Sequence, residues 1–272
     1  MGALLLLCPV IPSDTTSDAS IDTSIATGRD TIDGTIDGTI DGTVFDTGSI
    51  LPDDGVDGVD DIGALDVLHD REYRVRAFRL AGDRLLIRGA VRDQKPPNLY
   101  ITDDDQPLTI HHMQIDLEVG FPSLEIVAAT VRFETHPHGG CPSIIEHYGG
   151  LVGLSIARGF THKVRELFGG PRGCTHTTAL LQAMAPVAVQ CFWSMEAATP
   201  PTEPETDDAS VMRERRRARW STNLNTCHVW AEDGELIKNI EAGGEFGTPI
   251  FIAKRVAELG LEADDPRLRL HR

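Results

Sequence analysis

The sequence predicts an α+β fold, in which an antiparallel meander of about four strands is covered on one face by three helices. Apolar and polar residues alternate along residues 73–135, as they do in half-buried strands. From residue 144 onwards the apolar residues recur at helical spacing instead. The acidic residues are concentrated in the first 70 positions, which indicates a separate N-terminal tail.

The first 70 residues contain 15 Asp and one Arg, with no Glu or Lys, and so carry most of the formal net charge of −17. Residues 31–42 are three copies of Thr-Ile-Asp-Gly. This four-residue spacing of acids fits neither an EF-hand loop nor the nine-residue calcium-binding repeat. Because the segment is polar and self-repelling, we expect residues 1–70 to be a disordered, low-complexity acidic tail.

The alternating runs predict four strands joined in sequence order, with one face of the sheet open to water. The insert at residues 93–107 contains two adjacent prolines and an acidic triplet, and we expect it to be a loop. The predicted strands cover residues 73–80, 84–92, 108–119 and 124–135.

Three apolar stripes of helical period predict the helices that cover the sheet. Pro186 falls within the third stripe and is expected to bend that helix. Beyond a linker at residues 200–210, a C-terminal helix is expected at 249–260, so residues 71–272 form a single α+β domain. The three stripes lie at residues 144–152, 160–168 and 180–192.

Composition and length exclude several classes of protein. No apolar run approaches the roughly 18–20 residues that span a bilayer, so no membrane segment is expected. No large basic face offsets the acidity, so nucleic acid is not an expected partner. Five cysteines, an odd number, without a recognisable export signal favour reduced thiols and a cytoplasmic location.

Two adjacent histidines lie on the predicted strand 108–119. His111 shares its side of the strand with Met113 and Ile115, whereas His112 shares the opposite side with acidic and amide residues. We therefore expect His111 to point into the core and His112 to face water. A buried imidazole needs a partner for each ring nitrogen, which makes His111 a candidate site residue.

Cysteines stand at the starts of predicted helices. Cys141 precedes the first helix and Cys174 the third, and a helix N-terminus stabilises the thiolate form that attacks electrophiles or binds metal. His176 follows Cys174 by two residues, and Cys227 follows the linker. By contrast Cys191 lies on an apolar stripe and is expected to be a core thiol.

These residues support three alternative functions. The first is a metal-binding domain that holds zinc or iron through Cys141, Cys174, His176 and Cys227, with His111 beneath the site. No CxxC pair is present, so this hypothesis depends on the fold bringing distant residues together. The second is a metal-free enzyme whose nucleophile is Cys174 or Cys141, with a histidine as base, acting on a thioester or another small acyl substrate. The third is a non-catalytic protein that binds a partner through the acidic tail.

Several motifs resemble the bacterial domain-of-unknown-function family 2889, which has no established activity. The resemblance covers about residues 71–240. The family usually has Ile-His-Asp-Met where this chain has His112 in place of the Asp. If the family's Asp at this position were catalytic, its replacement by His112 would impair the activity of this protein. If that Asp only faces solvent, as the alternation favours, the replacement would have little effect. The matching motifs are Asp93-x-Lys95, Ile110-His111-His112-Met113, Cys141, Leu151-Val-Gly153, Gly159-Phe160, Gly173-Cys-Thr-His176 and Cys227-His228-Val-Trp-Ala-Glu-Asp-Gly234.

The order of elements is also similar to that of the NifU/IscU-type iron–sulfur scaffolds. In both, a hairpin is followed by a cysteine at a helix start, a Leu-rich turn, a helix, and a Cys/His pair that opens a long helix. Those proteins hold zinc or a nascent cluster at three cysteines and a fourth ligand, so the similarity implies zinc or iron here. The first-hairpin cysteine is missing in this chain, and Cys227 or His111 would have to replace it.

Overall fold

The computed structural model describes residues 50–51, 65–80, 83–157, 159–198 and, with interruptions, 208–268. These residues all belong to the contact unit that begins at Asp46. The predicted disordered tail falls outside the described residues except at positions 50, 51 and 65–70, and so does most of the predicted linker.

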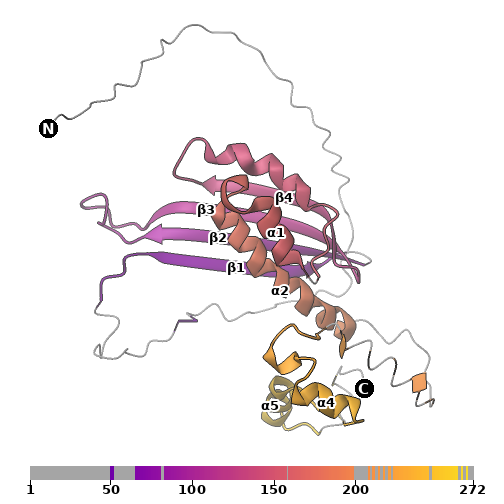
Figure 1. Cartoon of the computed structure of the whole chain (residues 1–272). Helices are drawn as coiled ribbons and strands as arrows, with labels where there is room; N and C mark the ends of the chain where they lie inside the picture. The colour runs from indigo at the N-terminus through magenta and orange to yellow at the C-terminus, as the bar shows by residue number, and fades with distance from the viewer. Residues whose placement is uncertain are drawn as a thin grey trace, which may run out of the picture. The chain divides into compact units, whose positions relative to one another are not determined.

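Four strands form one antiparallel sheet in the order β1-β2-β3-β4 (Figure 1), which confirms the predicted meander. The expectation of a loop from residue 93 is wrong, because β2 continues to Lys95. Alternation extends through Val91, so Asp93 is a strand residue on the inward side. The strands are β1 Asp70–Arg79, β2 Arg84–Lys95, β3 Leu108–Gly120 and β4 Glu125–Thr135.

Helical segments follow the sheet in the chain. The first, expected as an α-helix at 144–152, is the 3₁₀ segment η2, which has Pro142 in its first turn and two glycines near its end. The third begins at Thr175, directly after Cys174 as expected, and Pro186 lies inside it. The segments are η2 Cys141–Leu151, α1 Phe160–Phe168, η3 Gly170–Arg172, α2 Thr175–Ala198, η4 His228–Trp230, α4 Glu235–Glu241 and α5 Ile250–Glu258.

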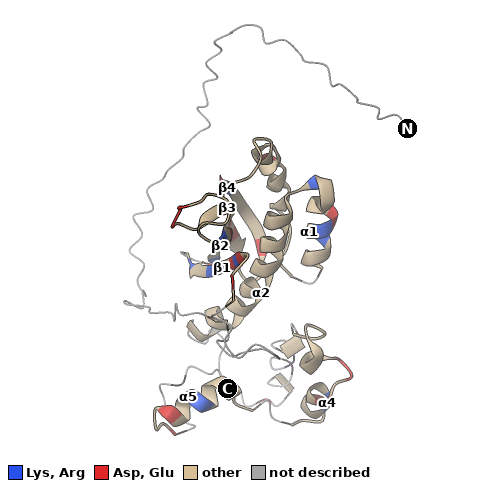
Figure 2. Ribbon diagram, turned by 90° about the vertical axis from the view of Figure 1, so that its left-hand side faces the viewer, with Lys and Arg blue, Asp and Glu red and all other residues tan. Residues whose placement is uncertain are grey.

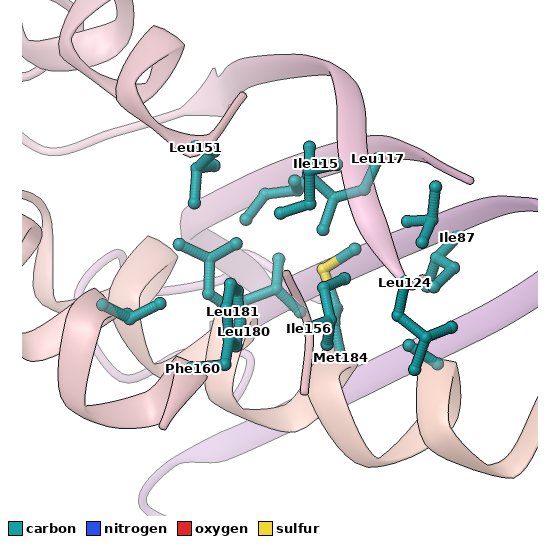
Figure 3. Packing of buried hydrophobic residues seen from close by; sticks show 14 of the residues in the cluster. Ile87, Ile115, Leu117, Leu124, Leu151, Ile156, Phe160, Leu180, Leu181 and Met184 are labelled. Atoms are coloured by element: carbon teal, nitrogen blue, oxygen red, sulfur yellow. The ribbon is translucent and has the colours of Figure 1, made fainter. Parts of the chain in front are cut away.

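The core lies between the sheet and the helices. Helix α2 contacts β1, β2 and β3, segment η2 contacts β4, and α1 packs on α2. Leu180 and Met184 of α2 belong to one buried cluster with the inward-facing Ile87 and Ile115 of the sheet (Figure 3), and all four are fully buried. Burial of such side chains is the main stabilising contribution to the fold.

The opposite face of the sheet is polar, as expected. Arg88 and Arg132 both donate to the carboxylate of Asp116, at 2.8–2.9 Å, and Arg84 pairs with Glu118. In Figure 2 charged residues lie on the strands, on α1 and in the C-terminal part that contains α4 and α5, while α2 is nearly free of them. Each exposed ion pair of this kind contributes little to stability. Most of the stability of the fold therefore comes from the apolar face that the helices cover.

The described C-terminal residues form a second, smaller apolar cluster, in which Trp220, Ile237 and Ile240 are buried. Helix α5 corresponds to the helix expected at 249–260. Within the part of the chain that the structure describes, no helix combines the length and the apolar character needed to cross a bilayer.

Gly89 is a position where α2 passes close to β2. A Cβ atom there would lie 2.6 Å from Met184 Sδ and 3.2 Å from Leu180 Cδ1. We expect Gly89→Val to lower the free energy of unfolding by about 1–3 kcal/mol through overpacking. Gly89→Ala should cost less, because the Met184 side chain is flexible.

Ala90→Val is the matched control, since it adds bulk on the same strand but on the open face. Urea unfolding should show a change within about 0.5 kcal/mol for this variant. Equal destabilisation at positions 89 and 90 would contradict the close packing of α2.

Candidate functional site

The candidate site lies where the N-terminal end of α2 covers the inward face of β2 and β3. Asp93 comes from β2, His111 from β3, and Cys174 and His176 from the start of α2. Asp93 and His111 are direct cross-strand partners, so the sheet register alone places them side by side.

Asp93 is the centre of the arrangement, and its side chain is 1% exposed. Arg71, its partner on β1, donates from Nε to Oδ1 at 2.6 Å and from Nη2 to Oδ2 at 2.7 Å. Burial would raise the pKa of Asp93, but the Arg71 guanidinium outweighs burial and lowers this pKa to about 2. The carboxyl group is therefore ionised at neutral pH.

Two imidazoles share one oxygen of this carboxylate. His111 Nδ1 and His176 Nε2 each lie 3.1 Å from Asp93 Oδ2, and their rings stack with centroids 3.8 Å apart. An ionised carboxylate only accepts hydrogen bonds, so each of these nitrogens must carry the proton. Nδ1 of His176 is then a bare acceptor. A third imidazole, His69, lies further away, with Nε2 3.6 Å from Asp93 Oδ1.

Burial and the neighbouring His176 lower the pKa of His111, although Asp93 opposes them. The neutral form of His111 is therefore favoured in this network.

Cys174 stands on the other side of His176, with Sγ 3.8 Å from Nδ1. Because α2 begins at Thr175, the sulfur occupies the position of an N-cap side chain, where the backbone amides of His176 and Thr177 favour its thiolate form. Burial would raise the pKa of the thiol. The His176 side chain and these amides together outweigh burial, and the pKa falls to about 7.

The backbone around Cys174 is fixed by its neighbours. The Cys174 amide donates to Oη of Tyr148 at 2.8 Å, and Tyr148 is itself buried and stacked on Phe168. At Gly173 a Cβ atom would collide with the carbonyl oxygen of Phe168. Only glycine fits there, which explains why a glycine precedes the cysteine.

The structure brings some of the expected ligands together and leaves others apart. Among the described residues, one group of at least three possible metal ligands lies within 4.8 Å of one another, and it consists of Asp93, His111 and His176. This group could hold a metal ion. Of the four expected ligands, only His176 belongs to it. Cys141, half-buried at the start of η2, Cys174, half-buried just before α2, and Cys227, exposed just before η4, are not part of it.

The expected directions of His111 and His112 and the expected burial of Cys191 are confirmed. His111 points inward to Asp93, while His112 lies on the open face with Arg74 and Arg92 around a shallow depression. Cys191 is buried in the core, and burial raises the pKa of its thiol.

Asp93 and Arg71 were missed as site residues by the sequence argument. A run rich in proline and acids suggested a loop, although the alternation of Ile87 and Val91 continues to Asp93 and could have revealed it. An inward-facing carboxylate on a strand needs a partner. The inward-facing arginine of the adjacent strand supplies that partner.

The model of the family described as "Protein of unknown function (DUF2889)" matches residues 69–190. The match includes β1 to β4 and most of α2, but not Cys227. No curated protein matches the chain, and no solved structure does. The similarity to NifU/IscU-type scaffolds thus stays a prediction from the sequence. The predicted resemblance to the DUF2889 family is thus confirmed over residues 69–190, which hold the whole candidate site.

Proposed function

We propose that this domain is a cysteine-dependent enzyme that acts on a thioester or another small acyl substrate. Cys174 is the nucleophile, His176 the base and Asp93 the group that orients the base. One observation carries the proposal: the two nitrogens of a single imidazole contact Cys174 Sγ at 3.8 Å and Asp93 Oδ2 at 3.1 Å. A nucleophile, a base and a group that orients the base recur in this order in enzymes that form acyl intermediates.

The chemistry follows from the tautomer of His176. Its bare Nδ1 takes the proton of the Cys174 thiol, and the sulfur attacks the substrate carbonyl carbon. The leaving group departs with the proton from Nδ1, which leaves a thioester on Cys174. Water then loses a proton to Nδ1 and attacks the same carbon. The C–S bond breaks, and the thiol recovers its proton.

Asp93 and Arg71 act on the base rather than on the substrate. The carboxylate keeps the proton of His176 on Nε2, so that Nδ1 stays free to accept. The guanidinium holds the carboxylate ionised and fixes both of its oxygens through the paired contacts to Nε and Nη2. Arg71 is therefore a positioning residue.

A zinc or iron centre formed by Asp93, His111 and His176 is the second candidate function. The mutual proximity of these three ligand atoms favours it. Two imidazoles and one carboxylate suit either metal, and three protein ligands would leave a position open for water or substrate.

The net charge of the ligand set, with Arg71 included, makes the metal centre the weaker of the two candidates. Arg71 already neutralises the only carboxylate of the group, so a divalent cation would add two positive charges to a ligand set that is neutral overall. The hydrogen-bonded arrangement needs no such compensation, and it also accounts for the position of Cys174.

The first prediction concerns thiol reactivity. With iodoacetamide as the probe, the alkylation rate of Cys174 should rise with pH and reach half its plateau near pH 7, because the thiolate reacts and its pKa is about 7. His176→Ala should move this midpoint upward, since the His176 hydrogen bond is the largest contribution that lowers the pKa. Cys191 is the internal control and should stay unmodified over this range, because burial raises the pKa of its thiol. Equal rates at both sites, mapped by mass spectrometry, would count against the proposal.

The second prediction concerns acyl transfer. Incubation with p-nitrophenyl acetate should give an acetyl adduct on Cys174 followed by slow turnover. Cys174→Ser should abolish both, and His176→Ala should lower the rate by roughly 10²–10⁴-fold. Cys227→Ser, a change at an exposed thiol outside the site, should behave like the parent protein. An adduct that survives in Cys174→Ser would remove Cys174 from the nucleophile role.

The third prediction separates the two candidates. Elemental analysis of protein purified without chelators should find less than stoichiometric zinc and iron if the cysteine enzyme is correct. One equivalent of either metal, retained through dialysis and lost in His111→Phe, would instead establish the metal centre. The phenyl ring keeps the stack on His176 but offers no ligand nitrogen.

A further inference from the structure

We infer that the catalytic site has a second, inhibited state, in which Zn²⁺ binds reversibly to Asp93, His111 and His176 and stops turnover at Cys174. This inference rests on the proposed cysteine chemistry and adds its regulation. The observation behind it is that His176 belongs both to the Cys174 pair and to the group that could hold a cation.

The spacing of the donor atoms suits one small cation. Asp93 Oδ2 lies 3.1 Å from His111 Nδ1 and 3.1 Å from His176 Nε2. Ligands about 2.1 Å from one zinc ion stand roughly 3–3.4 Å apart in its usual geometries. Both separations from Asp93 Oδ2 fall in this range, and all three ligand atoms lie within 4.8 Å of one another, so an ion that replaces the two N–H protons can be reached by all three side chains.

Zinc at Nε2 changes the tautomer of His176. A neutral imidazole carries one proton, and when Nε2 binds the ion that proton must be on Nδ1. Nδ1 then faces the Cys174 sulfur as a donor, at the 3.8 Å contact where it previously accepted. The ring can still stabilise a thiolate, but it can no longer take a proton from the thiol or from water.

The two halves of the reaction respond differently. An activated ester such as p-nitrophenyl acetate needs only the thiolate, so the acetyl adduct on Cys174 still forms. Hydrolysis of that adduct needs a base for the incoming water, and the zinc-bound His176 cannot supply it. Zinc therefore converts turnover into a single burst with the acyl-enzyme left in place.

The Arg71 guanidinium makes the binding of the ion weak and reversible. It contacts the same Oδ2 atom at 2.7 Å and repels a second cation there. Such a site suits an ion whose occupancy follows its concentration in solution, and not a permanently bound structural ion.

The test measures the p-nitrophenyl acetate reaction of the full chain over a Zn²⁺ titration. For the parent protein we expect the burst to remain, the later steady rate to fall at least tenfold, and the acetyl adduct to accumulate in the mass spectrum. His111→Phe removes one ligand and keeps the ring that stacks on His176. Inhibition of this variant is expressed relative to its own steady rate without zinc. It should need at least tenfold more Zn²⁺ than the parent protein for the same fractional inhibition.

A second measurement does not depend on turnover. Calorimetric titration with Zn²⁺ should show binding to the Cys174→Ser variant. The double variant that carries both Cys174→Ser and His111→Phe should show none. Equal zinc sensitivity of the parent and His111→Phe, or zinc binding that disappears in Cys174→Ser, would place the ion on the thiol and overturn the inference. A steady rate that zinc leaves unchanged would overturn it as well. Absence of an acyl-enzyme without zinc is a distinct result, because it refutes the proposed function itself and the inhibition with it.

Discussion

The ion pair between Arg71 and Asp93 is the interaction on which the candidate site depends. A carboxylate at the inner side of a strand is costly to bury, and removing one partner of a buried pair typically costs about 3–5 kcal/mol. Here the two contacts of 2.6 and 2.7 Å compensate for the burial of Asp93 and fix both of its oxygens. The tautomers of His111 and His176, and through His176 the acceptor that faces Cys174, follow from this fixed charge.

The packing of the fold and the geometry of the site are coupled through α2. The absence of a side chain at Gly89 lets the helix lie close to β2. The start of α2 is fixed separately by Tyr148, whose Oη accepts a hydrogen bond from the Cys174 amide. Both contacts fix the position of α2 and allow His176 to reach Asp93. Gly89, in the middle of the core, therefore contributes to the position of the proposed base.

The sequence allowed the sheet, its open face and the inward direction of His111 to be predicted, because strand alternation is a local property. It also indicated Cys174 and His176, since a helix start and an adjacent imidazole are visible within a few residues. The role of Asp93 was not predictable from local composition, because prolines and acids after Lys95 obscured the end of the strand. Its pairing with Arg71 depends on the register between β1 and β2, which no single segment specifies.

The location of Arg71 on an edge strand has a consequence for how the protein would lose its chemistry. Among the described strands β1 pairs with β2 alone, and its first residues carry the guanidinium that completes the site. Fraying of that strand, or a slip by one residue, would turn the arginine away while the remaining three strands and α2 stayed packed. The proposed activity would thus be lost before the fold melts, and a limited proteolytic cut just after Arg71 would remove the guanidinium while the other strands and α2 stayed packed.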